Sequence, residues 1–150
     1  MTTRGINLKT YALVFLFLGM VAGCRSNPTP PDRAIPVPQE FVLLKQQELG
    51  TLASRTIFIR DTDGPPGSRW LIHIDGEPAV RLGKGESYSV NLAPGDHIFG
   101  IEPDAKWKVL QVVNLDQVLT SGKTYYYRAM FSPDLGYRLQ RSTPGAPDAR

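Results

Sequence analysis

The stretch IHIDGEPAVRLGKGESYSVNLAPGDHIFGIE (72–102) is the most informative about the fold, because short alternating runs in it are separated by turn signals. The Asp75-Gly76 pair lies between two such runs and is a strong short-range hairpin signal. The segments GKGE (83–86) and APGD (93–96) supply the next two turns. The stretch therefore predicts consecutive short strands joined by tight turns.

The same pattern continues on both sides of this stretch. RTIFIRD (55–61) alternates in polarity and precedes the turn-rich DTDGPPGS (61–68). Further along come the β-rich runs KWKVLQVVNL (106–115) and KTYYYRAMF (123–131), joined through DQVLTSG (116–122), and then GYRLQR (136–141). No convincing helical period appears, although FVLLKQQELGTLAS (41–54) could form either a short strand or a helical turn. We predict an all-β fold, a small two-sheet antiparallel β-sandwich of seven or eight strands.

The N-terminus has the features of a secretory leader. MTTRGINLKT (1–10) carries two positive charges and no negative one, and YALVFLFLGMV (11–21) is apolar. The 13 residues from Tyr11 to Gly23 are fewer than the roughly 20 that span a bilayer as a helix. We therefore expect a cleaved leader rather than a membrane-spanning anchor.

Val21-Ala22-Gly23 and then Cys24 resemble the bacterial lipobox, a branched aliphatic residue and two small residues before a cysteine. The resemblance implies cleavage before Cys24 and acylation of its thiol and its new amino group. Stable anchoring needs at least two fatty chains. A cysteine acylated on both its thiol and its amino group meets this requirement and would hold the protein on a lipid bilayer. Because Cys24 is the one cysteine, no thiol would remain for a disulfide or a metal.

The segment after the cysteine, RSNPTPPDRAIPVPQ (25–39), has five prolines and reads as an extended tether. The predicted organisation is a signal peptide (1–23), a lipidated cysteine with a Pro-rich tether (24–40), a β-sandwich domain (41–141) and a disordered tail (142–150). Arg25 stands where an aspartate would signal inner-membrane retention in the enterobacterial pattern. We therefore expect a lipid anchor in the outer membrane, facing the periplasm.

Taken together, IFIRD (57–61), the stretch 72–102 and SGKTYYYRAMF (121–131) resemble the DUF2846 family of bacterial lipoproteins, which has a PEGA-like β-sandwich module. The resemblance covers roughly residues 55–140, judged from strand and turn signals. It implies the fold and the lipidation, and it implies no chemistry because the family has no established activity. The matching residues are Asp75, Gly76, Leu82, Gly85, Tyr88, Pro94, Gly95, His97, Gly122, Lys123, Tyr125 and Tyr126.

The charge balance argues against a nucleic-acid partner. The chain has a formal net charge of +3, but Arg4 and Lys9 belong to the leader. Without them, fifteen basic side chains face fourteen acidic ones. Nucleic-acid binding needs a concentrated basic face, so we expect no such partner.

No motif predicts catalysis, a cofactor or a metal. GESYS (85–89) lacks the final glycine of a nucleophile elbow, and GKT (122–124) lacks the glycine and the helix of a phosphate-binding loop. His73 and Asp75 could bridge a metal if His97 approached them, but no cluster has the usual zinc spacing. We predict that the protein is not an enzyme and has no catalytic, cofactor-binding or metal-binding residue.

The aromatic strand suggests one interaction surface. If Trp107, Tyr126 and Arg128 were exposed together, they could bind a glycan or a partner protein. The favoured alternative is that one tyrosine stripe fills the core and the other lies on an amphipathic surface. We predict a cell-envelope lipoprotein whose domain is a non-enzymatic interaction or assembly module with an unknown envelope partner. The alternative is a tethered ligand-binding module for peptidoglycan or another glycan.

Overall fold

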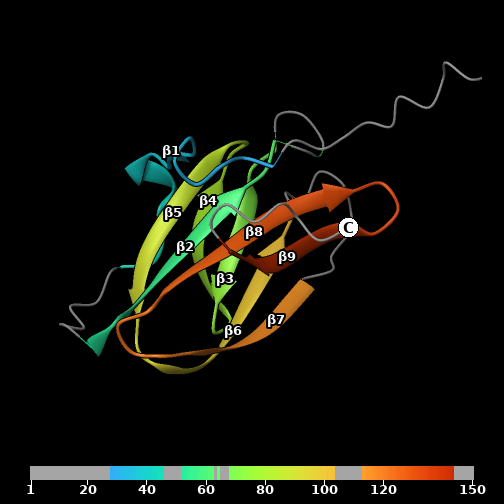
Figure 1. Ribbon diagram of the computed structural model, residues 1–150. Coiled ribbons are helices and arrows are strands. Elements are labelled where there is room, and N and C mark those ends of the chain that lie inside the picture. Colours follow the sequence, from blue (N-terminus) through green and yellow to red (C-terminus); the bar gives the residue numbers. More distant parts are fainter. Residues whose placement is uncertain (1–27, 46–51, 63, 65–67, 104–112, 144–150) are drawn as a thin grey trace, which may run out of the picture.

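The computed structural model describes residues 28–45, 52–62, 64, 68–103 and 113–143, and within these ranges the chain is built almost entirely of strands (Figure 1). No α-helix occurs in the described ranges, and none of their helical segments could cross a membrane. The elements are β1 (Ile35–Pro36), the 3-10 turn η1 (Gln39–Phe41), β2 (Ser54–Arg60), β3 (Trp70–Ile74), β4 (Glu77–Leu82), β5 (Glu86–Leu92), β6 (Gly95–Glu102), β7 (Val113–Leu119), β8 (Thr124–Ser132) and β9 (Gly136–Ser142).

The strands form two sheets that pack face to face. Sheet A has the order β1-β5-β2-β8-β9, and sheet B has the order β4-β3-β6-β7. The predicted all-β two-sheet sandwich is therefore confirmed. The described residues contain nine strands rather than seven or eight, because the two-residue β1 forms within the segment that the sequence had indicated as a tether.

The prediction of an antiparallel sandwich is wrong for two strand pairs. β2 and β8 run parallel in the middle of sheet A, in register from Arg55↔Thr124 to Arg60↔Ala129, and β1 runs parallel to β5. Hairpin signals determine only how neighbouring strands in the sequence pair. Because β2 and β8 are separated by β3 to β7, no local signal determines their direction.

The first hairpin of the stretch 72–102 forms as predicted. Asp75 and Gly76 have φ angles of 54° and 83°, and β3 and β4 pair antiparallel across them. Positive φ at both central residues is the type I′ requirement, which matches the twist of the flanking strands. Further along, β7 continues to Leu119, so the predicted connection 116–122 is partly strand. Residues 106–112 of the predicted preceding strand lie outside the described residues.

Aromatic rings link the two sheets in the core. Phe99 of sheet B lies edge-on to Phe58 and Tyr127 of sheet A, with ring centroids 5.1 and 4.8 Å apart. The Tyr127 hydroxyl donates a hydrogen bond of 3.1 Å to Gln117 Oε1 in β7. Tyr125 is also buried on this side of β8. The prediction that one tyrosine stripe fills the core is therefore confirmed.

An arginine lies inside the same core. Arg60 is fully buried on the face of β2 that carries Phe58, and its guanidinium carbon is 3.8 Å from the Trp70 ring centroid. Its Nη1 donates a 2.9 Å hydrogen bond to the Leu82 carbonyl oxygen. Burial lowers the pKa of Arg60 to about 10, because desolvation disfavours the cation.

The N-terminal segment is part of the fold rather than a free tether. Its amides at Ile35 and Val37 donate 2.9 Å hydrogen bonds to the carbonyl oxygens of Gly85, directly before β5, and Ser87 in β5. After η1, Val42 pairs with Val80 of β4, so the segment crosses from the edge of sheet A to the edge of sheet B. The predicted domain start at residue 41 is therefore wrong, because residues 28–40 already pack and pair with the sandwich.

Candidate functional site: where the N-terminal segment is fastened

A buried ion pair lies on the face of sheet A that is turned away from the core. Asp61 directly follows β2, and Arg128 lies on the neighbouring strand β8. Arg128 Nε donates to Asp61 Oδ2 at 3.2 Å, and Arg128 Nη2 donates to Oδ1 at 2.5 Å. The Arg128 and Asp61 side chains are only 7% and 3% exposed. This two-point geometry is the one in which a guanidinium binds a carboxylate most specifically.

The ion pair holds the backbone of Thr29. The Thr29 amide donates a 2.9 Å hydrogen bond to Asp61 Oδ1, and Arg128 Nη2 donates a 3.1 Å hydrogen bond to the Thr29 carbonyl oxygen. Both polar backbone groups of one residue are thus satisfied by one pair of side chains. We call Thr29, Asp61 and Arg128 the clasp.

The sequence around Thr29 explains why this residue is used. Residues 28, 30 and 31 are prolines, which have no backbone N–H. Thr29 therefore has the one backbone N–H group in Pro28–Pro31, and this group donates its hydrogen bond to Asp61. The flanking rings also restrict φ, so less conformational entropy is lost when this segment is ordered.

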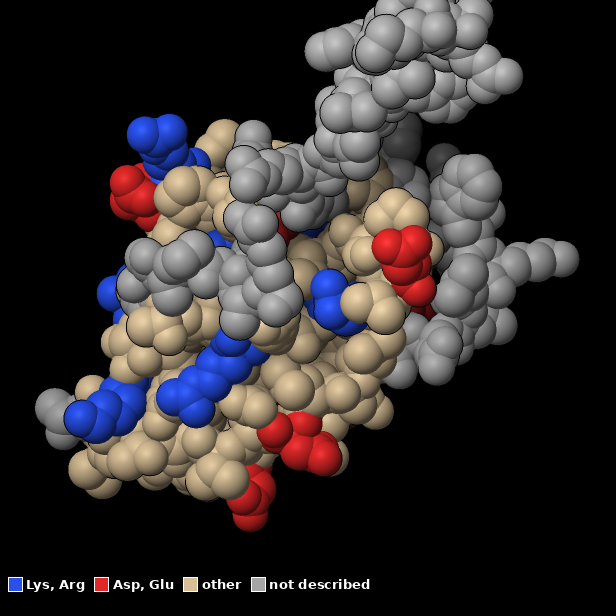
Figure 2. All heavy atoms as spheres, turned by 45° about the vertical axis from the view of Figure 1, so that its right-hand side comes forward, with Lys and Arg blue, Asp and Glu red and all other residues tan. Residues whose placement is uncertain are grey.

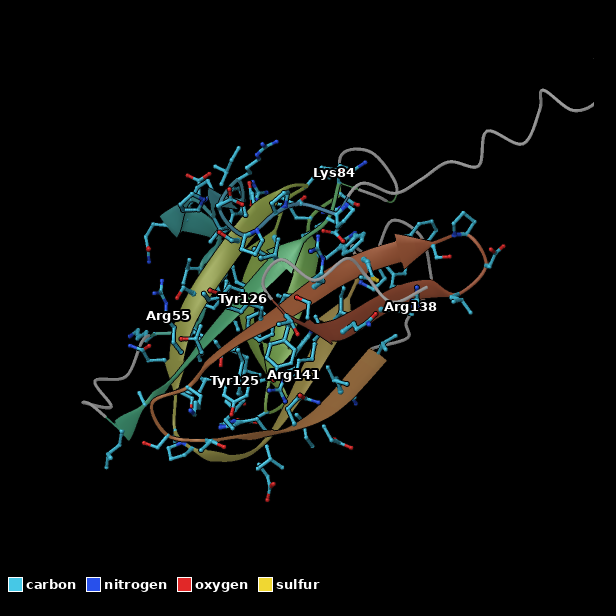
Figure 3. The ribbon with its side chains drawn as sticks, viewed as in Figure 1. Arg55, Lys84, Tyr125, Tyr126, Arg138 and Arg141 are labelled. Atoms are coloured by element: carbon cyan, nitrogen blue, oxygen red, sulfur yellow. The ribbon has the colours of Figure 1, made fainter. Side chains whose placement is uncertain are left out.

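A groove of about 520 Å³ lies beside the clasp, between the N-terminal segment and the outward side of sheet A. Its lining includes Asp32, Pro36, Arg55 and Tyr126. Arg55 lies to the left of Tyr126 in Figure 3, and its Nε donates a 3.1 Å hydrogen bond to Ser89 Oγ. The groove therefore has an aromatic ring, a guanidinium and a carboxylate along its walls.

The residues predicted to form an exposed interaction surface differ in how far they are buried. Tyr126 is half-buried and lines the groove, as above. Arg128 follows on the same side of β8, but the prediction that it is exposed is wrong, since the clasp occupies it. Trp107 and the predicted lipidation residue Cys24 lie outside the described residues.

The two histidines do not converge on a shared site. His73 Nε2 lies 2.9 Å from Glu102 Oε2, whereas His97 Nδ1 lies 2.7 Å from Asp75 Oδ2. Asp75 Oδ1 also accepts a 2.8 Å hydrogen bond from the Ile98 amide, which ties the β3–β4 turn to β6. Among the residues that the structure describes, no group of three His, Cys, Asp or Glu side chains could hold a metal ion.

The two near-matches to catalytic motifs occupy ordinary β structure. Ser87 lies within β5, paired with Pro36 on one side and with Ile59 on the other. Gly122, with φ of 67°, lies in the turn that precedes β8. Neither has the strand–turn–helix setting that a nucleophile elbow or a phosphate-binding loop requires.

Sequence reasoning missed the clasp itself. Asp61 had the same local signal as the other aspartates, a position next to a turn-rich segment. One available signal was the position of Arg128 in a β-rich run directly after three tyrosines, because a charge there needs a partner if it is buried. The partner is 67 positions away in the sequence, and no pattern in the chain points to it.

The chain matches no protein-family model and no curated protein.

Proposed function

We propose that the protein is a cell-envelope lipoprotein, acylated on Cys24, whose β-sandwich is a non-enzymatic interaction or assembly module. The leader and the lipobox-like Val21-Ala22-Gly23-Cys24 support the anchor, and Arg25 supports the outer membrane as its location. The resemblance to the DUF2846 family is part of this proposal. Its hairpin motif Asp75-Gly76 forms a type I′ turn here.

The observation that carries the proposal is the clasp. A lipid anchor fixes the position of a folded domain only if the chain between them is itself held in place. Here that chain is held by a buried ion pair at Thr29. Thr29 comes five positions after Cys24. A buried, two-point attachment so close to the lipidation residue is suited to keeping a domain at a fixed place near the bilayer.

The outward face of sheet B offers a surface for a protein partner. Ile98 of β6 and Val118 of β7 are 47% and 66% exposed. They are diagonal neighbours on this face, since Ile98 pairs with Asp116 and Val118 pairs with Asp96. An apolar pair flanked by the two carboxylates of Asp96 and Asp116 has the composition of a small interaction patch.

The second candidate function is binding of an envelope glycan. The groove beside the clasp favours it, because Tyr126 supplies an aromatic ring, and Arg55 and Asp32 supply hydrogen-bonding groups. Sugar rings bind to such combinations through stacking and hydroxyl contacts.

Three measurements test these proposals. Replacing Cys24 by Ala should move the protein out of the membrane fraction, and undiminished membrane association would refute acyl anchoring.

Incubation with isolated peptidoglycan sacculi separates the two functions. An interaction module should stay in the supernatant, whereas retention that Tyr126→Ala abolishes would establish the glycan-binding function instead. Cross-linking in cells should then identify the protein attached to the lipidated form.

A further inference from the structure

The clasp limits how far the domain can lie from its anchor. Residues 25–28 separate Cys24 from Thr29. An extended chain advances at most about 3.6 Å per residue, so the two Cα atoms can be at most about 18 Å apart. If Cys24 carries fatty chains in the bilayer, the lipid surface passes within roughly that distance of Thr29.

The short distance between Cys24 and Thr29 excludes one face of the molecule from contact with the bilayer. Thr29 lies over the outward face of sheet A, against Asp61 and Arg128. Packed sheets are about 10 Å apart, and the side-chain layers outside both sheets add a comparable thickness. A chain of this length cannot run around the sandwich edge and also reach past sheet B. The outward face of sheet B therefore cannot rest on the lipid.

The charges of the two outward faces differ in sign. On sheet A, Arg55 and Arg138 face outward, the carboxylate of Asp32 lines the groove over this face, and the carboxylate of Asp61 is neutralised by Arg128. Figure 2 shows Lys and Arg side chains across the middle and left of the view, with the visible carboxylates around the rim. Among the residues described on the outward face of sheet B, three are carboxylates and one is an arginine: Asp96, Glu102, Asp116 and Arg81.

We infer that the outward face of sheet A, with the clasp, Arg55, Tyr126 and Arg138, is turned toward the bilayer and rests on anionic phospholipid headgroups. The inference rests on the proposed acylation of Cys24 and adds the orientation of the domain. Figure 3 shows that Arg55, Tyr126 and Arg138 span the sheet from β2 to β9. The fatty chains supply the attachment, and the two arginines select the face, since their attraction to lipid acts within a Debye length of about 10 Å.

The opposite face is then presented to the periplasm. Ile98 and Val118 on sheet B point away from the lipid in this orientation. A protein partner can reach them without displacing the domain from the membrane, and the like-charged headgroups repel the carboxylates around them.

The test measures thiol accessibility in the mature lipidated protein. Gln140→Cys places a thiol on the outward face of sheet A, and Val118→Cys places one on sheet B. Each variant is reconstituted into vesicles of phosphatidylethanolamine and phosphatidylglycerol and treated with a membrane-impermeant maleimide. Relative to detergent solution, the thiol at position 140 should react several-fold more slowly and the thiol at position 118 at an unchanged rate. Equal rates at both positions in acylated protein would overturn the inference.

Further variants separate the effect of the arginines from the effect of the short chain between Cys24 and Thr29. Arg55→Glu should reduce the protection at position 140, whereas the matched Arg81→Glu on sheet B should not. A Gly/Ser linker of about 20 residues inserted after Arg25 should also reduce it, because such a linker spans roughly 25 Å. Protection that persists in phosphatidylcholine vesicles and in both variants would overturn the electrostatic part. Protection that appears only with added glycan fragments would favour the glycan-binding function.

The intact mass of the same sample distinguishes failure of the inference from failure of the proposed function. A mature chain that begins at Cys24 with added fatty chains, but shows equal labelling at both positions, refutes only the orientation. A chain without added fatty chains refutes the anchor, and the orientation with it.

Discussion

Arg128 donates a 3.1 Å hydrogen bond to the backbone carbonyl oxygen of Thr29, a residue 99 positions earlier in the chain. The contact ties a central strand of sheet A to the segment that precedes the sandwich. It turns a proline-rich stretch with the composition of a tether into a fixed part of the fold.

Replacing Asp61 by Asn should destabilise the protein strongly. The change leaves the Arg128 cation buried without its counter-ion, and breaking such a pair typically costs about 3–5 kcal/mol. Urea-induced unfolding measures the loss. Asp116→Asn, on the exposed side of β7, is the matched control and should change the free energy of unfolding by no more than about 0.5 kcal/mol. Equal effects of the two changes would refute the burial of the pair.

Two substitutions at Thr29 separate its backbone from its side chain. Thr29→Pro removes the amide that donates to Asp61, and an unsatisfied buried group costs about 1–3 kcal/mol. Thr29→Val keeps the amide and replaces a buried hydroxyl that has no hydrogen-bond partner among the residues that the structure describes, so it should be neutral or slightly stabilising. Thermal unfolding compares the two. A loss with Val as large as with Pro would mean that the side chain, not the backbone, is what the clasp holds.

Alkaline pH should weaken the fold through Tyr127. Burial raises the pKa of Tyr127 from 10.0 to about 12, so between these values the folded state keeps a proton that the unfolded state has lost. Its contribution to stability is complete below pH 10 and is lost as the pH rises toward 12. Arg60 acts in the opposite direction, since burial lowers its pKa to about 10 and the folded state releases its proton first.

Tyr127→Phe isolates the tyrosine from the arginine, because Arg60 is present in both proteins. The free energy of unfolding of the wild-type protein, relative to Tyr127→Phe, should therefore fall as the pH rises through this interval. A constant offset between the two proteins across the interval would mean that only the hydrogen bond to Gln117 distinguishes them.

Asp75→Gly should destabilise the protein although glycine suits the backbone there. Glycine adopts the φ of 54° without strain, so the loss reports the carboxylate contacts with Ile98 and His97. We expect a cost of about 1–3 kcal/mol in chemical denaturation. Asp75→Asn keeps an acceptor for the Ile98 amide and should recover part of it. No difference between Gly and wild type would show that the carboxylate does not fasten the turn.

The sandwich could be predicted from the sequence because its determinants are local. The type I′ turn at Asp75-Gly76 and the alternation in β2, β3 and β8 all depend on neighbouring residues. The parallel pairing of β2 with β8 could not be predicted, since it forms between strands that no short turn connects.

The candidate site could not be predicted for the same reason. Thr29, Asp61 and Arg128 meet only in the folded chain, and each has a common explanation in its own segment: a tether residue, a turn residue and a strand residue. Arg128 was selected from the sequence as a surface residue. The pairing with Asp61 reverses that assignment, because a buried charge is tolerated when a counter-charge and hydrogen bonds satisfy it.

Amide hydrogen exchange at Thr29 shows whether the chain is fastened to sheet A a few residues after the predicted lipidation residue. We expect the Thr29 amide to exchange as slowly as the amides of β2 and β8, and Asp61→Asn to speed its exchange by orders of magnitude relative to those strands. Exchange at Thr29 as fast as in an unstructured peptide would contradict the clasp, and with it the fixed position of the domain near its anchor.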